Sequence, residues 1–209
     1  MSKEKQPFLK TSYDLREQAD TDAFYDKWAD SYDKELTENE YAQPERCSEA
    51  LSAVETNTEA KILDVGCGTG LSGRALSHAG FKNIDGCDIA VAMLEKAKLS
   101  GVYGNLFVAD LNAPPINVEN DSYDAATVVG VFSFGHVMPD ALDEFCRTVR
   151  IGGHLIIGLN QYFYDDSGLQ DKIDSLVAQH KIEVLGKDLG THIAGTDTKG
   201  WVITLKKLK

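Results

Sequence analysis

Apolar residues recur along the chain in two rhythms, and the change between them falls near residue 60. Before this point, apolar residues lie three and four positions apart, first from Thr21 onward and again after Pro44, which is the spacing of one face of a helix. After it, short runs rich in β-branched residues alternate with helical segments. The pattern therefore predicts helices in the first part of the chain and alternating strands and helices in the second.

Seven strands are expected in the second part: KILDV (61–65), NIDGCD (83–88), GNLFVAD (104–110), YDAATVVG (123–130), GGHLIIGL (152–159), 182–189 and 200–207. Helices are expected between them at 71–79, 90–99, 140–149 and 165–179. This alternation is typical of βαβ units, in which helices cover both faces of a parallel sheet. The last two strands are too close in sequence for a crossover helix, so we expect them to form an antiparallel hairpin. The predicted fold is an α/β, Rossmann-like, doubly wound, mostly parallel seven-stranded sheet with an antiparallel C-terminal hairpin.

Composition and charge narrow the class of partner. The 209 residues carry a net charge of −12, and the basic residues are scattered, so we expect neither nucleic acid nor an anionic membrane as a partner. The four cysteines form no CxxC pair, which favours a reduced protein with no metal site. No run approaches the roughly 20 apolar residues of a membrane helix, and the first residues do not look like a signal peptide. We expect a cytoplasmic protein whose oligomeric state cannot be read from the sequence.

A glycine-rich turn follows the first expected strand, in the segment Asp64-Val65-Gly66-Cys67-Gly68-Thr69-Gly70. Glycines at alternate positions let the backbone turn sharply and let a ligand lie against it. The dinucleotide fingerprint GxGxxG would need its third glycine at position 71, where the chain has Leu71. The turn therefore indicates a ligand site but does not favour a dinucleotide.

Carboxylates follow the next two strands. Asp88 lies 22 residues after Gly66, where a carboxylate can accept two hydrogen bonds from ribose hydroxyls, with Ile89 and Met93 flanking an adenine. Asp88 can instead cap the helix that starts near Ala90. Asp110 follows the third strand, where it can accept from an adenine amino group, or can be a turn residue. We favour the ligand interpretation for Asp88 and leave both open for Asp110.

Together these strand ends resemble the successive motifs of the class I S-adenosylmethionine-dependent methyltransferases, carried by ILDVGCGTG, GCDIA, VADLN, YDAATVVGVFSFGHV and VRIGGHLIIGL. The resemblance spans about residues 61–159. It implies S-adenosylmethionine as the cofactor. It also implies a role for each strand end, with the methionyl part at Gly66, Cys67, Gly68 and Gly70, the ribose at Asp88, and the adenine at Asp110 and Leu111. Asp64 is a further expected cofactor-binding residue.

A finer resemblance links the chain to proteins similar to the Williams–Beuren syndrome chromosome region 27 methyltransferase, through YDKWADSYDKEL (25–36), Tyr41, Pro44 and GVFSFGHV (130–137). Class I relatives often fold an N-terminal helix over the cofactor, which implies that residues 1–58 form a tail and helical cover and residues 59–209 the core. Tyr32 is then expected to donate to the methionyl carboxylate, and Tyr25 to line the substrate side. Trp28 is expected to be a core residue.

The loop after the fourth strand is expected to approach the methyl group through Gly130, Val131 and Phe132. Ser133 and His136 follow, and Asn160 after the fifth strand is a further substrate-pocket candidate. His136 is the candidate general base because its ordinary pKa lies near neutrality. It can equally be a histidine that only hydrogen-bonds a loop carbonyl. Methyl transfer does not require a protein base, because the positioning of two reactants supplies much of the catalysis.

The preferred interpretation is a methyltransferase that acts on a small-molecule acceptor. The segment Asn112-Ala113-Pro114-Pro115 resembles the NPP signature of amino-group and nucleobase methyltransferases, but it follows the third strand rather than the fourth, so we interpret it as a loop. Two alternatives remain: a non-catalytic module that binds S-adenosylmethionine, and a nicotinamide-dependent oxidoreductase on a similar fold. The acceptor and its reactive atom cannot be read from the sequence.

Overall fold

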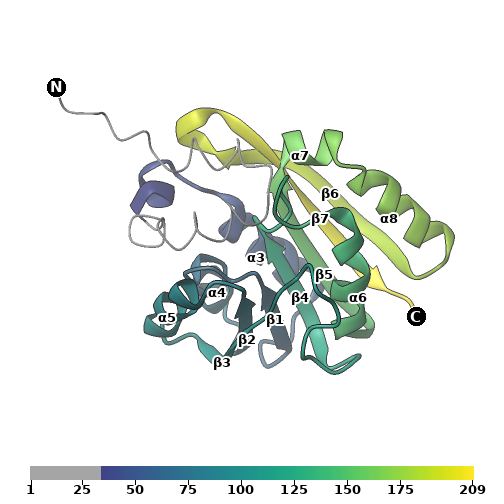
Figure 1. Cartoon of the computed structure of the whole chain (residues 1–209), viewed down its shortest axis with the longest axis horizontal. Helices are drawn as coiled ribbons and strands as arrows, with labels where there is room; N and C mark the ends of the chain where they lie inside the picture. Colours follow the sequence, from purple (N-terminus) through teal and green to yellow (C-terminus); the bar gives the residue numbers. More distant parts are fainter. Residues whose placement is uncertain (1–33) are drawn as a thin grey trace.

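The computed structural model describes residues 34–209 (Figure 1). The predicted helix from Thr21, and with it Tyr25, Trp28 and Tyr32, lies outside the described residues, so the division at residue 58 stays a prediction. The elements follow in the order α3 (Gln43–Val54), β1 (Lys61–Val65), α4 (Leu71–His78), β2 (Asn83–Asp88), α5 (Val91–Leu99), β3 (Tyr103–Val108), β4 (Tyr123–Val129), η1 (Pro139–Ala141), α6 (Leu142–Thr148), β5 (Val149–Asn160), α7 (Gln161–Asp166), α8 (Leu169–Ala178), β6 (Ile182–Ile193), η2 (Ala194–Thr196) and β7 (Thr198–Lys207).

One seven-stranded sheet runs through the molecule in the order β3-β2-β1-β4-β5-β7-β6. The first five strands pair in parallel, and β7 lies antiparallel between β5 and β6. The predicted fold, including the antiparallel C-terminal hairpin, is therefore confirmed. The strand order reverses between β1 and β4, and ligands of open α/β sheets bind beyond the carboxyl ends of the strands at such a reversal.

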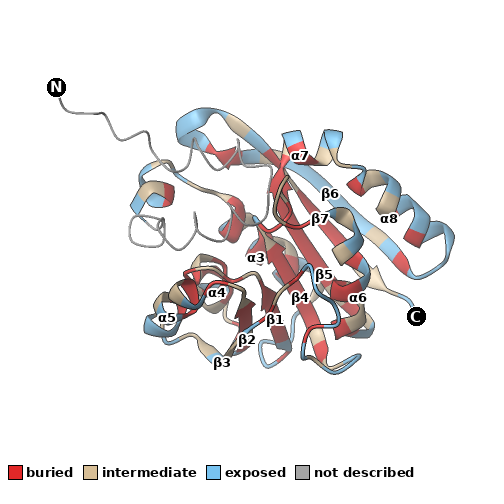
Figure 2. Ribbon diagram, viewed as in Figure 1, coloured by how far each residue is buried: buried red, intermediate tan, exposed pale blue. Residues whose placement is uncertain are grey.

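The central strands are buried along most of their length (Figure 2). Alternating residues of these strands belong to two separate cores, one on each face of the sheet. Ile62 packs with Leu51 of α3 and Leu76 of α4 on one face. The next residue, Leu63, belongs to the larger core on the other face. There it joins side chains of α6, α7 and α8, among them Phe145 and Ile173. Both strand faces are thus buried, which explains why the central strands are nearly continuous apolar runs.

The prediction of a single helix at 165–179 is wrong, because the structure has two helices in this region, α7 and α8. The chain turns at Gly168, whose φ of 79° is left-handed and disfavours any side chain with a Cβ. Helix α7 starts at Gln161, before the predicted start at 165. The Asn160 side chain caps this helix by accepting a hydrogen bond from the Phe163 amide. Within residues 34–209 no helix is long and apolar enough to cross a membrane.

Candidate functional site

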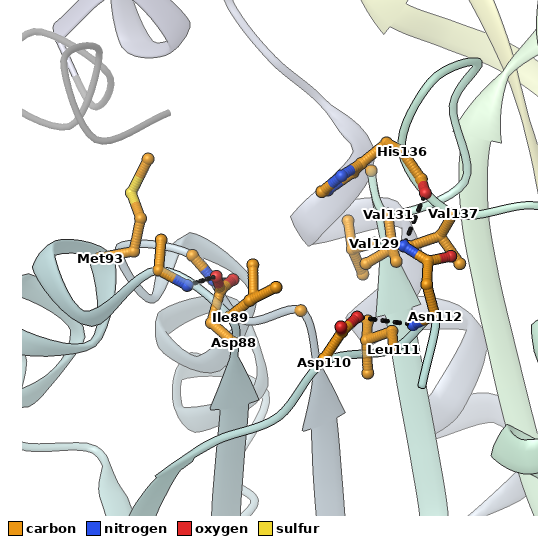
Figure 3. Close-up of a pocket in the computed structure, with 14 residues that line it drawn as sticks. Asp88, Ile89, Met93, Asp110, Leu111, Asn112, Val129, Val131, His136 and Val137 are labelled. Carbon is orange, nitrogen blue, oxygen red and sulfur yellow. Dashed lines mark hydrogen bonds between the residues drawn. The ribbon is translucent and has the colours of Figure 1, made fainter. Parts of the chain in front are cut away.

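A cavity opens beyond the carboxyl ends of β1, β2 and β4, where the strand order reverses, and holds about 710 Å³ of empty space including its mouth (Figure 3). Asp88, Ile89 and Met93 stand on one side of it (Figure 3). Asp110 and His136 stand on the other. The structure therefore brings together ten of the residues that the sequence singled out: Gly66, Gly68, Asp88, Ile89, Met93, Asp110, Leu111, Gly130, Val131 and His136.

Two glycines of the glycine-rich turn, Gly66 and Gly68, line this cavity, and neither can be replaced without cost. Gly66 and Gly68 have left-handed φ angles of 64° and 52°. A Cβ at Gly66 would meet Val131 Cγ2 at 2.5 Å, so this position also lacks room. A Cβ at Gly68 would meet nothing within 4 Å, which leaves the backbone there open to a ligand.

Asp88 joins the glycine turn to the start of α5. Its two carboxylate oxygens accept hydrogen bonds of 2.9 Å from the amides of Gly68 and Ala90. Burial raises the pKa of this carboxyl above its ordinary value, and the Ala90 and Gly68 amides act in the opposite direction. Each oxygen has capacity for a further donor. The structure thus gives α5 no side-chain cap, but Asp88 contacts the Ala90 amide directly before this helix, and that contact is compatible with the ligand contact considered from the sequence.

Asp110 and Asn112 belong to the loop after β3 and shape the opposite wall. The Asp110 Oδ1 accepts a hydrogen bond of 2.9 Å from the Asn112 amide, which is the turn geometry considered for it from the sequence. The Asn112 Nδ2 donates to the backbone carbonyl of His136 at 2.9 Å. The His136 imidazole projects into the cavity (Figure 3). When the imidazole is protonated, its charge lowers the pKa of Asp88, an effect smaller than that of burial.

Asp64 does not line the cavity. It is fully buried beneath the glycine turn, where it accepts hydrogen bonds from the hydroxyls of Ser72 at 2.6 Å, Tyr103 at 2.7 Å and Thr127 at 3.0 Å. Burial raises its pKa to about 6, and the three hydroxyls oppose the rise. Asp64 therefore supports the glycine turn from below by tying together β1, α4, β3 and β4.

Two further predicted residues of the turn also lie away from this cavity. Cys67 is buried against Leu94 and Ala97 of α5. Its backbone contributes to the turn through a hydrogen bond of 2.9 Å from the Cys67 amide to the Cys87 carbonyl. Gly70 is the residue before α4 and has a φ of 90°. Both therefore shape the turn, whose Gly66 and Gly68 line the cavity.

Most of the predicted substrate residues that the structure describes also lie away from the cavity. Phe132 is 1% exposed and packs between Phe145 and Phe163, with ring centroids 5.7 and 6.1 Å away. Asn160 is occupied as the cap of α7. Ser133 lies in the loop, where its carbonyl accepts from the His136 amide, and is not part of the cavity wall. Among the described substrate candidates, the structure brings His136 alone to the cavity.

Four lining residues were not predicted as site residues from the sequence: Ala90, Asn112, Val129 and Val137. A signal existed for Asn112, because it lies two residues after the carboxylate that ends the third strand. The other three are small or apolar residues. They give no chemical signal, so only their neighbours in sequence could have indicated them.

Comparison with known protein families yields a match to one described as "Methyltransferase domain", over residues 63–157. Human methyltransferase-like protein 27 is 34% identical over 132 residues, which cover 62% of this chain and 54% of that protein. The chain thus spans about half the length of this relative. An uncharacterized methyltransferase of Oceanobacillus iheyensis is 29% identical over 79% of this chain and 78% of its own. A probable 18S rRNA (guanine-N(7))-methyltransferase of Dictyostelium discoideum is 32% identical over half of this chain.

Solved structures show the same fold. A complex between the Haloferax volcanii Trm112 methyltransferase activator and a methyltransferase matches with a TM-score of 0.67 at 15% identity, over 88% of this chain and 96% of that one. A TehB-like S-adenosylmethionine-dependent methyltransferase of Corynebacterium glutamicum matches with a TM-score of 0.62 at 21% identity, over 86% and 97%. At these identities the likeness concerns the fold alone.

Proposed function

We propose that this chain, which belongs to the class I S-adenosylmethionine-dependent methyltransferases, transfers a methyl group to a small-molecule acceptor. The methyl donor of this family is S-adenosylmethionine. Support for the activity comes from the match over residues 63–157, which contains the glycine turn and both carboxylates of the cavity. Family membership also removes the reason for considering a nicotinamide-dependent oxidoreductase, since the turn has Leu71 where that fingerprint needs glycine.

The cavity suits an adenosine with an attached sulfonium chain. An open backbone at Gly68 lies beside a half-buried carboxylate, Asp88, which can accept from a ribose diol. Apolar side chains of Ile89, Met93 and Leu111 supply walls for a planar base. We assign the ribose to Asp88, the adenine to Asp110 and Leu111, and the methionyl part to the glycine turn.

Bound S-adenosylmethionine supplies a methyl group already activated on a sulfonium sulfur. The chain's contribution is to place the acceptor in line with that methyl group and to keep water out. Transfer from this donor would form a bond between the acceptor atom and the methyl carbon as the carbon–sulfur bond breaks, with its electron pair left on sulfur. For an acceptor that carries a proton, we assign its removal to the His136 imidazole, which projects into the cavity.

The charge of the cavity supports an acceptor that is neutral or cationic. Among the described residues that line it, two are carboxylates, Asp88 and Asp110, and none is lysine or arginine. A phosphate-rich acceptor such as RNA would lack basic partners there, and the net charge of −12 would repel it. This is the observation that favours a small molecule over the ribosomal RNA named for the Dictyostelium relative.

Turnover is the test of this proposal. The full chain is incubated with S-adenosylmethionine and, separately, with a panel of neutral and cationic metabolites, a panel of anionic metabolites, and total RNA. We expect release of S-adenosylhomocysteine with at least one neutral or cationic compound, and loss of that release in Asp88→Ala. Methylation of RNA alone would overturn the acceptor class. Binding of the cofactor with no turnover on any acceptor would favour the non-catalytic module instead.

A further inference from the structure

Asn112 links two loops that the sequence separates by 24 residues. Its backbone amide donates to Asp110 Oδ1 and its side-chain Nδ2 donates to the carbonyl of His136, each at 2.9 Å (Figure 3). One bond therefore holds the side of the cavity that we assign to adenine. The other holds the loop from which the candidate base projects.

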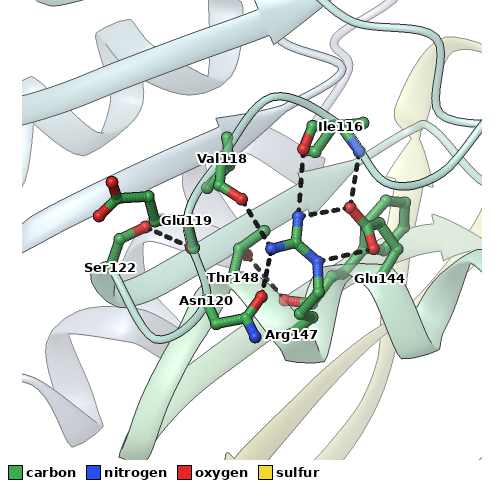
Figure 4. Close-up of polar contacts among 9 residues, drawn as sticks. Ile116, Val118, Glu119, Asn120, Ser122, Glu144, Arg147 and Thr148 are labelled. Carbon is green, nitrogen blue, oxygen red and sulfur yellow. Dashed lines mark hydrogen bonds and ion pairs between the residues drawn. The ribbon is translucent and has the colours of Figure 1, made fainter.

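The loop that carries Asn112 is anchored at its far end. Arg147 of α6 donates to the carbonyls of Val118 at 2.6 Å and Ile116 at 3.2 Å, and Glu144 accepts from the Ile116 amide at 2.8 Å (Figure 4). Arg147 and Glu144 also pair with each other at 2.6 Å, which raises the pKa of the arginine and lowers that of the glutamate, so both stay charged. The loop between β3 and β4 is thus fixed to α6 at its far end, just before β4 begins.

The loop that carries His136 is held at its other points by packing and by short-range bonds. The ring of Phe134 lies 4.8 Å from that of Phe163, and the His136 amide donates to the Ser133 carbonyl. These contacts fix the loop to α7 and to itself. The Asn112 side chain instead fixes it to the wall on which Asp110 stands. A displacement of Asp110 by a bound ligand would therefore reach His136 through Asn112.

We propose that Asn112 is a positioning residue, which couples occupation of the adenine side of the cavity to the placement of His136. The inference rests on the proposed function, because it takes the cofactor as the occupant. Asn112 acts through the backbone carbonyl of His136 and has no part in proton transfer. Its loss should leave the adenine side occupied and release the His136 loop.

Hydrogen exchange of the full chain, followed by mass spectrometry with and without S-adenosylhomocysteine, tests the coupling without an acceptor. The variants are Asn112→Asp, which keeps the shape but removes the donor, and Asn112→Ala. Asn117→Ala is the matched control, since Asn117 is an exposed asparagine of the same loop. In wild type and in the control we expect the ligand to protect residues 66–70, 88–93 and 131–138.

In both Asn112 variants we expect protection of residues 66–70 and 88–93 to remain, while exchange of residues 131–138 in the liganded protein rises about fivefold, as expected for one lost hydrogen bond. A purely structural role would raise exchange of 131–138 equally with and without ligand, or lower the unfolding midpoint. That outcome, or full protection of 131–138 in the variants, would overturn the coupling. Absence of protection at 66–70 and 88–93 in the wild type would instead overturn the proposed cofactor site, and the coupling with it.

Discussion

Asp88 shows how one side chain at a strand end can serve the fold and also face the cavity in which we propose that the cofactor binds. Its oxygens accept from the amides of Gly68 and Ala90, which sets the path of the glycine turn and the start of α5. The same carboxylate faces the cavity (Figure 3). A residue with both tasks explains why the sequence supports two interpretations of it, since both the cap pattern and the ligand pattern place a carboxylate here.

Asp88→Ala should lower the affinity for S-adenosylhomocysteine by at least about tenfold, because hydrogen bonds to a charged group contribute roughly 1.5–3 kcal/mol. Asp85→Ala is the matched control. Asp85 lies on the same strand and accepts from the Tyr123 hydroxyl, away from the cavity. Isothermal titration calorimetry measures both variants. Equal loss of affinity in the two would show that the effect is structural and would remove Asp88 from the site.

His192 makes the stability of the protein depend on pH. It is 4% exposed, packs edge-on against Tyr41 with centroids 5.2 Å apart, and its Nδ1 has no hydrogen-bond partner within the described chain. Burial lowers its pKa from 6.5 to about 4. The unfolded chain therefore takes up this proton first, so the contribution of His192 to stability is complete above pH 6.5 and is lost as the pH falls toward 4.

His192→Phe should remove this dependence. Between pH 7 and pH 4 we expect the free energy of unfolding of the wild type to fall by up to about 3 kcal/mol more than that of the variant. Urea denaturation at a series of pH values gives the difference, and other titrating groups cancel in it. Parallel curves for the two proteins would mean that His192 does not carry the effect.

At the scale of elements, polar contacts fix the relative positions of strands, helices and loops, which hydrophobic packing alone does not specify. Asp64 joins three hydroxyls from α4, β3 and β4 below the glycine turn. Arg147 and Glu144, which pair with each other within α6, hold the loop between β3 and β4 through hydrogen bonds to the backbone of Val118 and Ile116 (Figure 4). The first arrangement lies beneath the glycine turn that lines the cavity, and the second fixes the far end of the loop that carries Asn112.

Tyr103→Phe keeps the ring but removes the hydroxyl that donates to Asp64. The change should cost about 1.5–3 kcal/mol of unfolding free energy at pH 8, where Asp64 is charged, because the lost bond is charge-assisted. It also raises the pKa of Asp64 further above 6, since this hydroxyl lowers it. The cost should therefore shrink at pH 5, where the carboxyl is protonated. Denaturant unfolding at the two pH values measures it, and a cost that grows at pH 5 would contradict the assignment.

Arg147→Gln should lower the free energy of unfolding by about 1–3 kcal/mol, because it leaves carbonyls of the loop and the Glu144 carboxylate without their donor. Arg150→Gln is the control, since Arg150 forms a more exposed salt bridge with Asp124. Chemical denaturation of both variants provides the comparison. A larger loss in Arg150→Gln than in Arg147→Gln would contradict the role given to Arg147 and Glu144.

At the scale of the whole molecule, the sequence predicted the class of sheet, the strand segments and the edge of the sheet where the site lies. It could do so because strand positions follow from local apolar periodicity, and ligand positions follow from the carboxyl ends of the strands. The break at Gly168 was missed, because a single glycine within a helical pattern does not decide whether the helix ends there.

The cavity wall was predicted less completely than the fold. Phe132 and Asn160 were expected at the substrate, yet Phe132 packs in the core and Asn160 caps a helix. Which way a loop side chain points depends on one or two backbone angles, and periodicity does not give them. The contact of Asn112 with His136 joins two such loops, so it follows from the three-dimensional structure alone.

Direct binding of the cofactor tests the central claim most plainly. S-adenosylhomocysteine is titrated into the full chain and into Asp88→Ala by isothermal titration calorimetry, with NADH as the competing class of ligand. We expect one binding site per chain for S-adenosylhomocysteine, a weakening of at least about tenfold in the variant, and no heat with NADH. Absence of S-adenosylhomocysteine binding at millimolar concentration, or binding of NADH in its place, would contradict the account.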